Sequence, residues 1–319
     1  MDDRYETITL AHRFNTKIAG TSFRQSEIKK LHQGQELVLS RESENPHDSN
    51  AIAVFSGDGQ VGYLNKDLAK HLAPAIDNGL VDYKCAVLDI TGGTSEKPTL
   101  GVNIELTNKY DYDLVTCPLN NRTVRFNPAT HHYYDGKGNR MLSGSAFQAM
   151  YEYPFPSLGD KYELKGKQAR DFGTAIHEAI ELKGKYDMDA SSTVVRLIVD
   201  DLFEKLGETR RGYEVFVAHG NLCGFIDCLQ INSDGTLTIL DWKCVDSLIA
   251  KERACKPPFE DLTSKGGHYS LQQNFYRVIL ERMGYKVKSM YLVALHDGHW
   301  LQREVKRLDV ESELRKLGM

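Results

Sequence analysis

A carboxylate and an amine stand two residues apart at the end of an apolar run, in the tripeptide Asp241-Trp242-Lys243. The run from Thr236 to Cys244 is typical of a β-strand, where alternate side chains point to opposite faces, so Asp241 and Lys243 share a face. Such a pair can bind a cation and stabilise charge on a phosphate. An isolated tripeptide of this kind is more commonly a surface ion pair at a strand end.

A second carboxylate is expected opposite the first. The run Leu222 to Ile231 precedes the turn cluster Asn232-Ser233-Asp234-Gly235, and the two runs predict a β-hairpin. If a three-residue loop closes the hairpin with Gly235 in the left-handed conformation, Asp227 lies opposite Asp241, whereas a two-residue loop would put Asp227 on the other face. Adjacent carboxylates repel unless a cation lies between them, so the first register predicts a divalent metal site.

His177 lies on a predicted helix beside an apolar stripe, and Gly173, one turn earlier, lets another group approach this helix closely. The stripe consists of Phe172, Ala175, Ile176, Ala179 and Ile180. Before this helix, the basic segment from Lys161 to Arg170 is interpreted as a loop that is either solvated or faces a phosphate backbone. A lone histidine at a helix edge is more commonly structural than a ligand, so its role depends on its neighbours.

Two more elements carry polar residues. Glu214 is expected to begin the β-run that precedes the hairpin. Gln272 and Tyr276 are one turn apart on a predicted helix. We expect Ser270 to open that helix, with Gln273 completing a capping box.

The motifs G-x-x-x-H, E, G-x-x-D, D-x-K and Q-x-x-x-Y occur in this order between residues 173 and 276. Their order on the expected helices and strands resembles the RecB-type branch of the PD-(D/E)XK nucleases, over residues 131 to 310. The segment before them also resembles the start of viral and mobile-element exonucleases of this group. The resemblance implies an α/β restriction-endonuclease-like core, with a mixed central sheet flanked by helices.

The same resemblance implies a metal site. Its ligands would be His177, Asp227, Asp241 and the backbone carbonyl of Trp242. Glu214 would serve a second metal or orient these ligands. Mg²⁺ is the expected ion, because oxygen ligands and phosphate chemistry suit it, and Mn²⁺ should substitute for it.

The remaining motif residues have implied catalytic roles. Lys243 would position or help deprotonate the attacking water and stabilise the phosphate. Gln272 and Tyr276 would hydrogen-bond the DNA backbone and brace Lys243. Some relatives hold an iron–sulfur cluster with cysteines after this last motif; no cysteine follows Tyr276, so no iron–sulfur cluster is expected.

Composition bounds the class of protein. The 319 residues suit two domains, and 41% hydrophobic with 26% charged residues is typical of a soluble globular protein. The net charge of -4 excludes a strongly basic nucleic-acid binder, so DNA binding would depend on local patches or on metal. The sequence has no membrane-spanning run and no secretory leader, so we expect a cytoplasmic protein of a prokaryotic host or a virus. The six cysteines lack paired spacing and are interpreted as reduced core thiols.

Residues 5–106 predict a compact, mostly β domain. Six short strand-like runs are separated by turns, and one amphipathic helix is expected from Lys66 to Asn78. This pattern favours a small β-barrel or sandwich with one helix packed on it. The runs are ETITLAHRF, QELVLSRE, NAIAVFS, QVGYLN, VDYKCAVLDI and TLGVNIELT.

Three segments of this domain resemble the HIRAN domain: G-T-S-F-R at 20–24, L-S-R-E-S-E-N-P-H-D-S-N-A-I-A-V at 39–54 and V-G-Y-L at 61–64. HIRAN domains are OB-like barrels that capture the 3′ end of single-stranded DNA in enzymes that remodel stalled forks. The resemblance implies that Phe23 and His47 stack on a terminal base, and that Asn45 and Asp48 hydrogen-bond the terminal nucleotide. The residues Asn45-Pro46-His47-Asp48 also favour a turn, with or without a ligand.

We therefore expect a HIRAN-like domain over residues 1–108, a linker over 109–128 and a nuclease domain over 129–319. The function expected is that of a metal-dependent deoxyribonuclease, an exonuclease acting on DNA ends or single-stranded DNA in recombination, repair or replication. Two alternatives stay open: an endonuclease of a defence or restriction system, and a non-catalytic adaptor that binds DNA ends. The expected partner is DNA, without a membrane, and the sequence is compatible with a homo-oligomer.

Overall fold

The computed structural model describes residues 5–154, 160–245 and 247–319, and for residues 160–166 it describes the backbone alone. The chain divides into two compact units. One unit consists of Thr9–Val115 and Arg125–His131. The other consists of Met1–Ile8, Thr116–Val124 and His132–Met319.

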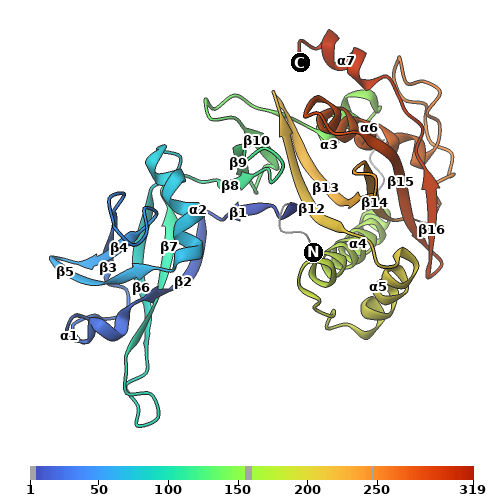
Figure 1. The fold of residues 1–319 in the computed structure, drawn as a ribbon. Coiled ribbons are helices and arrows are strands. Elements are labelled where there is room, and N and C mark those ends of the chain that lie inside the picture. Colours follow the sequence, from blue (N-terminus) through green and yellow to red (C-terminus); the bar gives the residue numbers. More distant parts are fainter. Residues whose placement is uncertain (1–4, 155–159, 246) are drawn as a thin grey trace. The chain divides into compact units, whose positions relative to one another are not determined.

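The first unit is built on a closed barrel whose strands follow one another in the order β2-β5-β4-β3-β6-β7 (Figure 1). Along β7 every second residue is buried, because one face of the strand lines the barrel core. The strands are β2 (Arg13–Ala19), β3 (Glu36–Arg41), β4 (Ile52–Ser56), β5 (Gly59–Leu64), β6 (Tyr83–Thr91) and β7 (Gly101–Asn108).

One long helix, α2 (Lys66–Asp77), packs on this barrel. Its Leu72 and Ala73 are fully buried in the core, and the side chain of Asn65 caps its first turn by accepting the N–H of Leu68. The short elements η2 (Thr21–Phe23) and α1 (Gln25–Ile28) lie between β2 and β3. The prediction of a small barrel with one packed helix is confirmed.

The second unit is organised around a mixed sheet of six strands with the order β11-β13-β14-β15-β16, in which β12 also pairs with β13. The strands β14 and β15 run parallel, while β12, β13 and β14 form antiparallel neighbours. The strands are β11 (Leu142–Ser143), β12 (Arg211–His219), β13 (Leu222–Ile231), β14 (Leu237–Cys244), β15 (Val287–His296) and β16 (His299–Glu304).

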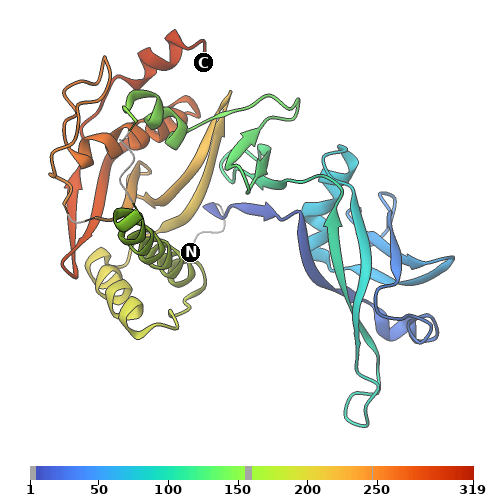
Figure 2. The same ribbon diagram turned by 180° about the vertical axis from the view of Figure 1, so that it is seen from behind.

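Helices cover both faces of this sheet, so the central strand β14 is buried along its first six residues. Helices α4 (Asp160–Tyr186) and α5 (Thr193–Leu206) lie on one face; α3 (Gly144–Tyr151) and α6 (Lys265–Arg282) lie on the other (Figures 1 and 2). Phe147 and Phe275 belong to the core on the α3 and α6 face. Ile176 and Trp242 belong to the core on the α4 and α5 face.

The prediction of an α/β core with a mixed central sheet flanked by helices is confirmed. Helix α7 (Val310–Lys316) follows β16. A separate four-stranded sheet has the order β1-β8-β9-β10, with β1 (Ile8–Leu10), β8 (Asp113–Thr116), β9 (Thr123–Asn127) and β10 (His132–Tyr134). Within the ranges described above, no helix combines the length and apolarity needed to cross a membrane.

Three expectations about local structure are wrong. Lys161 to Arg170 is part of α4 and not a loop, because good helix formers outweigh its single glycine. Helix α6 begins at Lys265, where Ser264 caps it, and not at Ser270; the pair Gly266-Gly267 disguises this first turn as a loop. Strand β12 begins at Arg211, so Glu214 lies inside the strand and does not begin it.

Candidate active site

The hairpin between β13 and β14 has the register that brings two aspartates together. The N–H of Asn232 bonds the carbonyl of Thr236, which leaves a three-residue loop between them, and Gly235 in that loop has a φ of 77°. The ladder pairs Cys228 with Leu240, so in the same register the next two residues away from the turn, Asp227 and Asp241, lie opposite each other. Of the two registers that the sequence left open, the structure has the one with the three-residue loop.

Glu214 lies beside Asp227 on the other neighbouring strand, at a point where both strands change sides. The flanking register pairs are Tyr213 with Cys228 and Val215 with Ile226. The first pair packs into the core under α4 and α5, whereas the second packs into the core under α3 and α6. Strict alternation would keep both pairs on one face. The change occurs at Glu214, whose φ of 48° is left-handed, a conformation that residues other than glycine rarely adopt.

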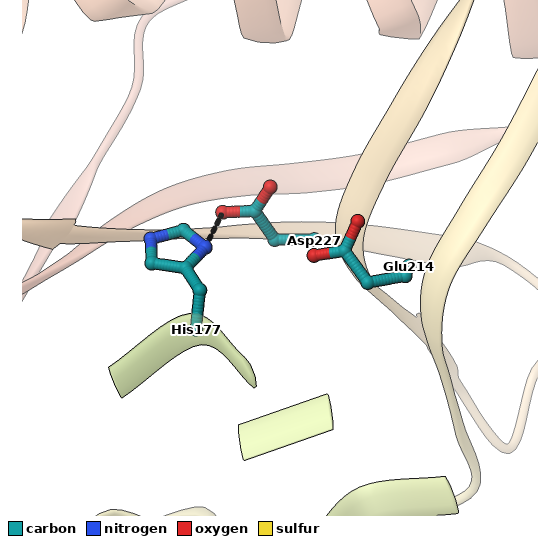
Figure 3. Close-up of side chains that lie close together, drawn as sticks. All are labelled: His177, Glu214 and Asp227. Atoms are coloured by element: carbon teal, nitrogen blue, oxygen red, sulfur yellow. Dashed lines mark ion pairs between the residues drawn. The ribbon is translucent and has the colours of Figure 1, made fainter. Parts of the chain in front are cut away.

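Helix α4 brings His177 to this pair of carboxylates. Ile176 and Ile180 are fully buried, so this face of the helix is fixed against the sheet. His177 lies next to that buried face. The Nε2 atom of His177 lies 3.0 Å from the carbonyl oxygen of Trp242, and its Nδ1 atom lies 3.7 Å from Oδ2 of Asp227. Figure 3 shows the imidazole and the two carboxylates converging.

These three side chains form a group that fits a divalent cation. One ligand atom from each of His177, Glu214 and Asp227 lies within 4.8 Å of the other two. A carbonyl can only accept, so Nε2 of His177 donates to Trp242, and Nδ1 is the ring nitrogen turned toward Asp227. Carboxylates with one imidazole are a donor set suited to Mg²⁺ or Mn²⁺.

Asp227 is also fixed by the backbone. Its Oδ2 atom accepts the N–H of Trp242 at 2.9 Å. The same oxygen faces His177, so one carboxylate oxygen is oriented by the strand and directed at the imidazole. A partner of this kind fixes a metal ligand before the ion binds.

Asp241 is paired with Lys243 and stands outside this group of three. Its Oδ2 atom lies 2.6 Å from Nζ of Lys243, and both side chains are largely buried. The ammonium of Lys243 also lies 5.1 Å from the ring centroid of Tyr269 on α6, a cation–π contact. Tyr269 was not predicted; no motif marks it, because it lies in the unexpected first turns of α6.

The site brings several carboxyl groups close together, which disfavours the ionised form of each. Burial raises the pKa of Glu214 to about 8, with Asp227 and Glu181 adding to the effect. Burial and Asp227 raise the pKa of Asp241 to about 7, while Lys243 opposes the shift. The pKa of Lys243 is itself raised: burial would lower it, but Asp241 and Asp227 outweigh burial. The amine therefore stays protonated at neutral pH, and the carboxylates gain most from an added cation.

Gln272 and Tyr276 meet through a hydrogen bond of 3.0 Å from the amide of Gln272 to the phenol oxygen. The ring of Tyr276 is buried, and it fills the space left by two glycines: a Cβ on Gly144 or Gly224 would come 2.8 Å from ring atoms. The glycine of the G-x-x-D motif is thus required by this packing. Contact of these residues with DNA stays a prediction.

A cleft of about 660 Å³ is lined by two residues of the group of three, His177 and Glu214. Besides His177 and Glu214, its lining includes Arg170, Lys265 and Tyr269. Two cations and an aromatic ring around an acidic centre suit a phosphodiester strand with unstacked bases. Lys265, like Tyr269, was missed because the start of α6 was misplaced.

The barrel has its own hollow, of about 290 Å³, lined by Asn45, His47 and Asp48 together with Tyr63 and Lys66 among others. Three of the four residues implied for DNA binding thus lie together. Phe23, the fourth, is not part of this lining and is 86% exposed.

Side-chain hydrogen bonds to the backbone stabilise the loop that carries these residues as a turn. Oδ1 of Asn45 accepts the N–H groups of His47 and Asp48, and Oδ1 of Asp48 accepts the N–H of Asn50. Arg41 donates to the carbonyls of Ser49 and Ala51 and forms a bidentate pair with Asp77. The two interpretations of this segment, turn and ligand site, are therefore compatible.

Comparison with known proteins shows which proteins the barrel resembles. The chain is 33% identical over 100 residues to a Fanconi-associated nuclease 1 homolog from Arabidopsis thaliana, covering 30% of this chain and 11% of the relative. It is 48% identical over 52 residues to a helicase-like transcription factor from Oryctolagus cuniculus, covering 16% of this chain and 5% of the relative. The chain thus spans a small part of the curated relatives it matches.

A solved structure, the HIRAN domain of human HLTF, is 25% identical, with a TM-score of 0.26, covering 31% of this chain and 78% of that one. The family model of the HIRAN domain matches residues 12–107, which include the first five barrel strands and all of β7 except its last residue, Asn108. Residues 12–107 therefore form a HIRAN domain.

Proposed function

We propose that this protein is a metal-dependent deoxyribonuclease of the RecB-type PD-(D/E)XK class, in which the HIRAN domain binds DNA ends. The observation that carries the proposal is the convergence of His177, Glu214 and Asp227, from a helix and two strands, next to a cleft that Lys243 lines together with His177 and Glu214. The likeness to a protein named as a nuclease is compatible with this proposal.

In this proposal His177, Glu214 and Asp227 would hold a Mg²⁺ or Mn²⁺ ion. The backbone carbonyl of Trp242 and the carboxylate of Asp241 would lie next to that ion. The bound ion would supply Lewis acidity and a more acidic water for attack on phosphorus. Lys243, held as a cation by Asp241, orients the water and stabilises the negative charge that develops on the phosphate. Its raised pKa favours this electrostatic role over that of a general base.

The nucleic acid would enter the cleft next to this centre. Arg170 and Lys265 can each contact a phosphate, and Tyr269 offers a ring face for a base. On the barrel, Asn45, His47 and Asp48 line the hollow where a terminal nucleotide would bind, and the exposed ring of Phe23 is available for stacking. Two sites for DNA, one of them for an end, favour an exonuclease.

The test is hydrolysis of matched linear and circular DNA by the full chain with Mg²⁺ or Mn²⁺. We expect the linear DNA to be degraded from an end and the circle to persist, and Asp227→Asn to abolish the activity. Equal cutting of both substrates would favour the endonuclease alternative. Binding without any cutting would favour the adaptor alternative.

A further inference from the structure

The left-handed backbone of Glu214 accepts a hydrogen bond from a residue near the start of the chain, Thr7. Oγ1 of Thr7 donates to the carbonyl oxygen of Glu214 at 3.0 Å and accepts the N–H of Phe216 at 2.7 Å. Both groups belong to β12, at the place where its ladder to β13 is interrupted. The hydroxyl therefore satisfies two backbone groups of β12, one on each side of Val215.

The local sequence gives β12 no other means of adopting this conformation. Glutamate in the left-handed region is strained, and the residues around it, Val215, Phe216 and Val217, are β-branched or aromatic and prefer a regular strand. All three are fully buried, so the strand cannot relax by moving outward. The strain is retained because the surroundings specify this geometry, and Thr7 supplies its two direct hydrogen bonds.

The segment that carries Thr7 is itself anchored on the same strand. A Cβ on Gly212 would come 2.8 Å from Cβ of Tyr5, so the missing side chain lets the segment lie close to β12. Tyr5 also packs against the core under α3 and α6. Tyr5, Thr7 and Glu214 all belong to the same compact unit.

We propose that Thr7 is a positioning residue for the candidate active site: its hydroxyl holds Glu214 in the left-handed conformation and so directs the carboxylate of Glu214 toward His177 and Asp227. A regular strand would not switch faces at this point, and the carboxylate would leave the group of three. The consequence for metal binding rests on the proposed function. The consequence for the backbone does not.

The experiment compares Thr7→Val, which removes the hydroxyl at nearly constant shape, with Thr7→Ser, which keeps it. Binding of Mn²⁺ to each full-length variant is measured by titration, and the conformation of residue 214 is determined by crystallography. We expect Thr7→Val to weaken Mn²⁺ binding about 10- to 100-fold, the range typical of lost partners of metal ligands, and to move Glu214 toward the β region. Thr7→Ser should retain both properties.

A third variant controls for general destabilisation. Ser192→Ala also removes a hydroxyl that accepts a backbone N–H, at the first turn of α5, without touching β12. It should lower the Tm while leaving Mn²⁺ affinity near that of the wild type.

A left-handed residue 214 with wild-type Mn²⁺ affinity in Thr7→Val would overturn the proposal. A wild-type chain that neither binds Mn²⁺ nor cuts DNA would instead remove the proposed function. In that case the position of Glu214 in Thr7→Val crystals alone decides whether the hydroxyl holds the strand.

Discussion

Asp227 accepts the backbone N–H of Trp242 with the carboxylate oxygen that also faces His177. A side chain thus takes the place of a ladder hydrogen bond between β13 and β14. Asp227→Asn keeps an oxygen that can accept this bond but loses the charge. We expect it to fold with a Tm near the wild-type value. The rate of DNA hydrolysis should fall more than about 100-fold, which exceeds the usual effect of losing a residue that only hydrogen-bonds a metal ligand. Hydrolysis assays with thermal unfolding would test this, and an active Asp227→Asn would contradict the assigned role.

The buried pair of Asp241 and Lys243 gives a second prediction. Lys243→Met leaves the carboxylate without its cation, and we expect a loss of about 3–5 kcal/mol in the free energy of unfolding. The double variant Asp241→Asn with Lys243→Met removes both charges and should recover most of this stability without recovering hydrolysis. Urea denaturation of the three proteins measures the difference. Equal stability of the single and double variants would show that the two charges are not coupled.

Two glycines of the nuclease-like motifs should respond differently to alanine. A Cβ on Gly224 meets the ring of Tyr276 at 2.8 Å, and its φ of 154° is unfavourable for alanine, so Gly224→Ala should destabilise by about 1–3 kcal/mol. A Cβ on Gly173 lies 3.7 Å from Cβ of Cys244, an ordinary contact, so Gly173→Ala should fold normally. Thermal unfolding distinguishes the two. Similar melting of both variants would remove the packing explanation for Gly224.

The raised carboxyl pKa values predict how stability depends on pH. Folding raises the pKa of Glu214 from 4.5 to about 8, so between these values the folded chain binds a proton that the unfolded chain has released. Stability of the metal-free chain should therefore fall as pH rises from about 5 to about 8. Mn²⁺ replaces the proton and should restore the Tm most strongly near the upper end. Melting curves across this range in EDTA and in Mn²⁺ test both statements, and Glu214→Gln should flatten the EDTA profile.

The HIRAN domain allows a prediction about DNA binding that does not depend on DNA hydrolysis. Phe23 is 86% exposed, so Phe23→Ala should leave the fold unchanged. If the ring stacks on a base, its loss should weaken binding of a single-stranded oligonucleotide by about 1–3 kcal/mol. Fluorescence anisotropy with oligonucleotides ending in a 3′-hydroxyl or a 3′-phosphate measures this, and Asp48→Ala should reduce the preference for the hydroxyl. Unchanged affinity in Phe23→Ala would exclude stacking.

Much of the architecture follows from local patterns. The strand-like run TLGVNIELT, the Asn-Ser-Asp-Gly turn with its left-handed glycine, and the apolar stripe beside His177 each predicted the element that the structure contains. These features are local, because a strand or turn is specified by residues that lie within a few positions of one another. The register that pairs Asp227 with Asp241 depends on the loop length, and the sequence left loops of two and of three residues open.

The features that escaped prediction depend on distant residues. Gly266 and Gly267 weaken helix propensity, yet they lie in a helix because Gly266 packs against the carbonyl of Leu248, where a Cβ would come within 3.0 Å. Glu214 has the propensity of an ordinary residue, and only contacts from other strands and from Thr7 impose its left-handed conformation. Propensity reports the chain's local preference, and packing overrides it at these points.

The compact unit that holds the candidate active site is not a continuous stretch of chain, because Met1–Ile8 belongs to it while the HIRAN domain begins at residue 12. A fragment cut to start at residue 129 would retain every motif letter and still lack Thr7. To isolate this unit, a circular permutation or a co-expressed N-terminal peptide should succeed where simple truncation fails.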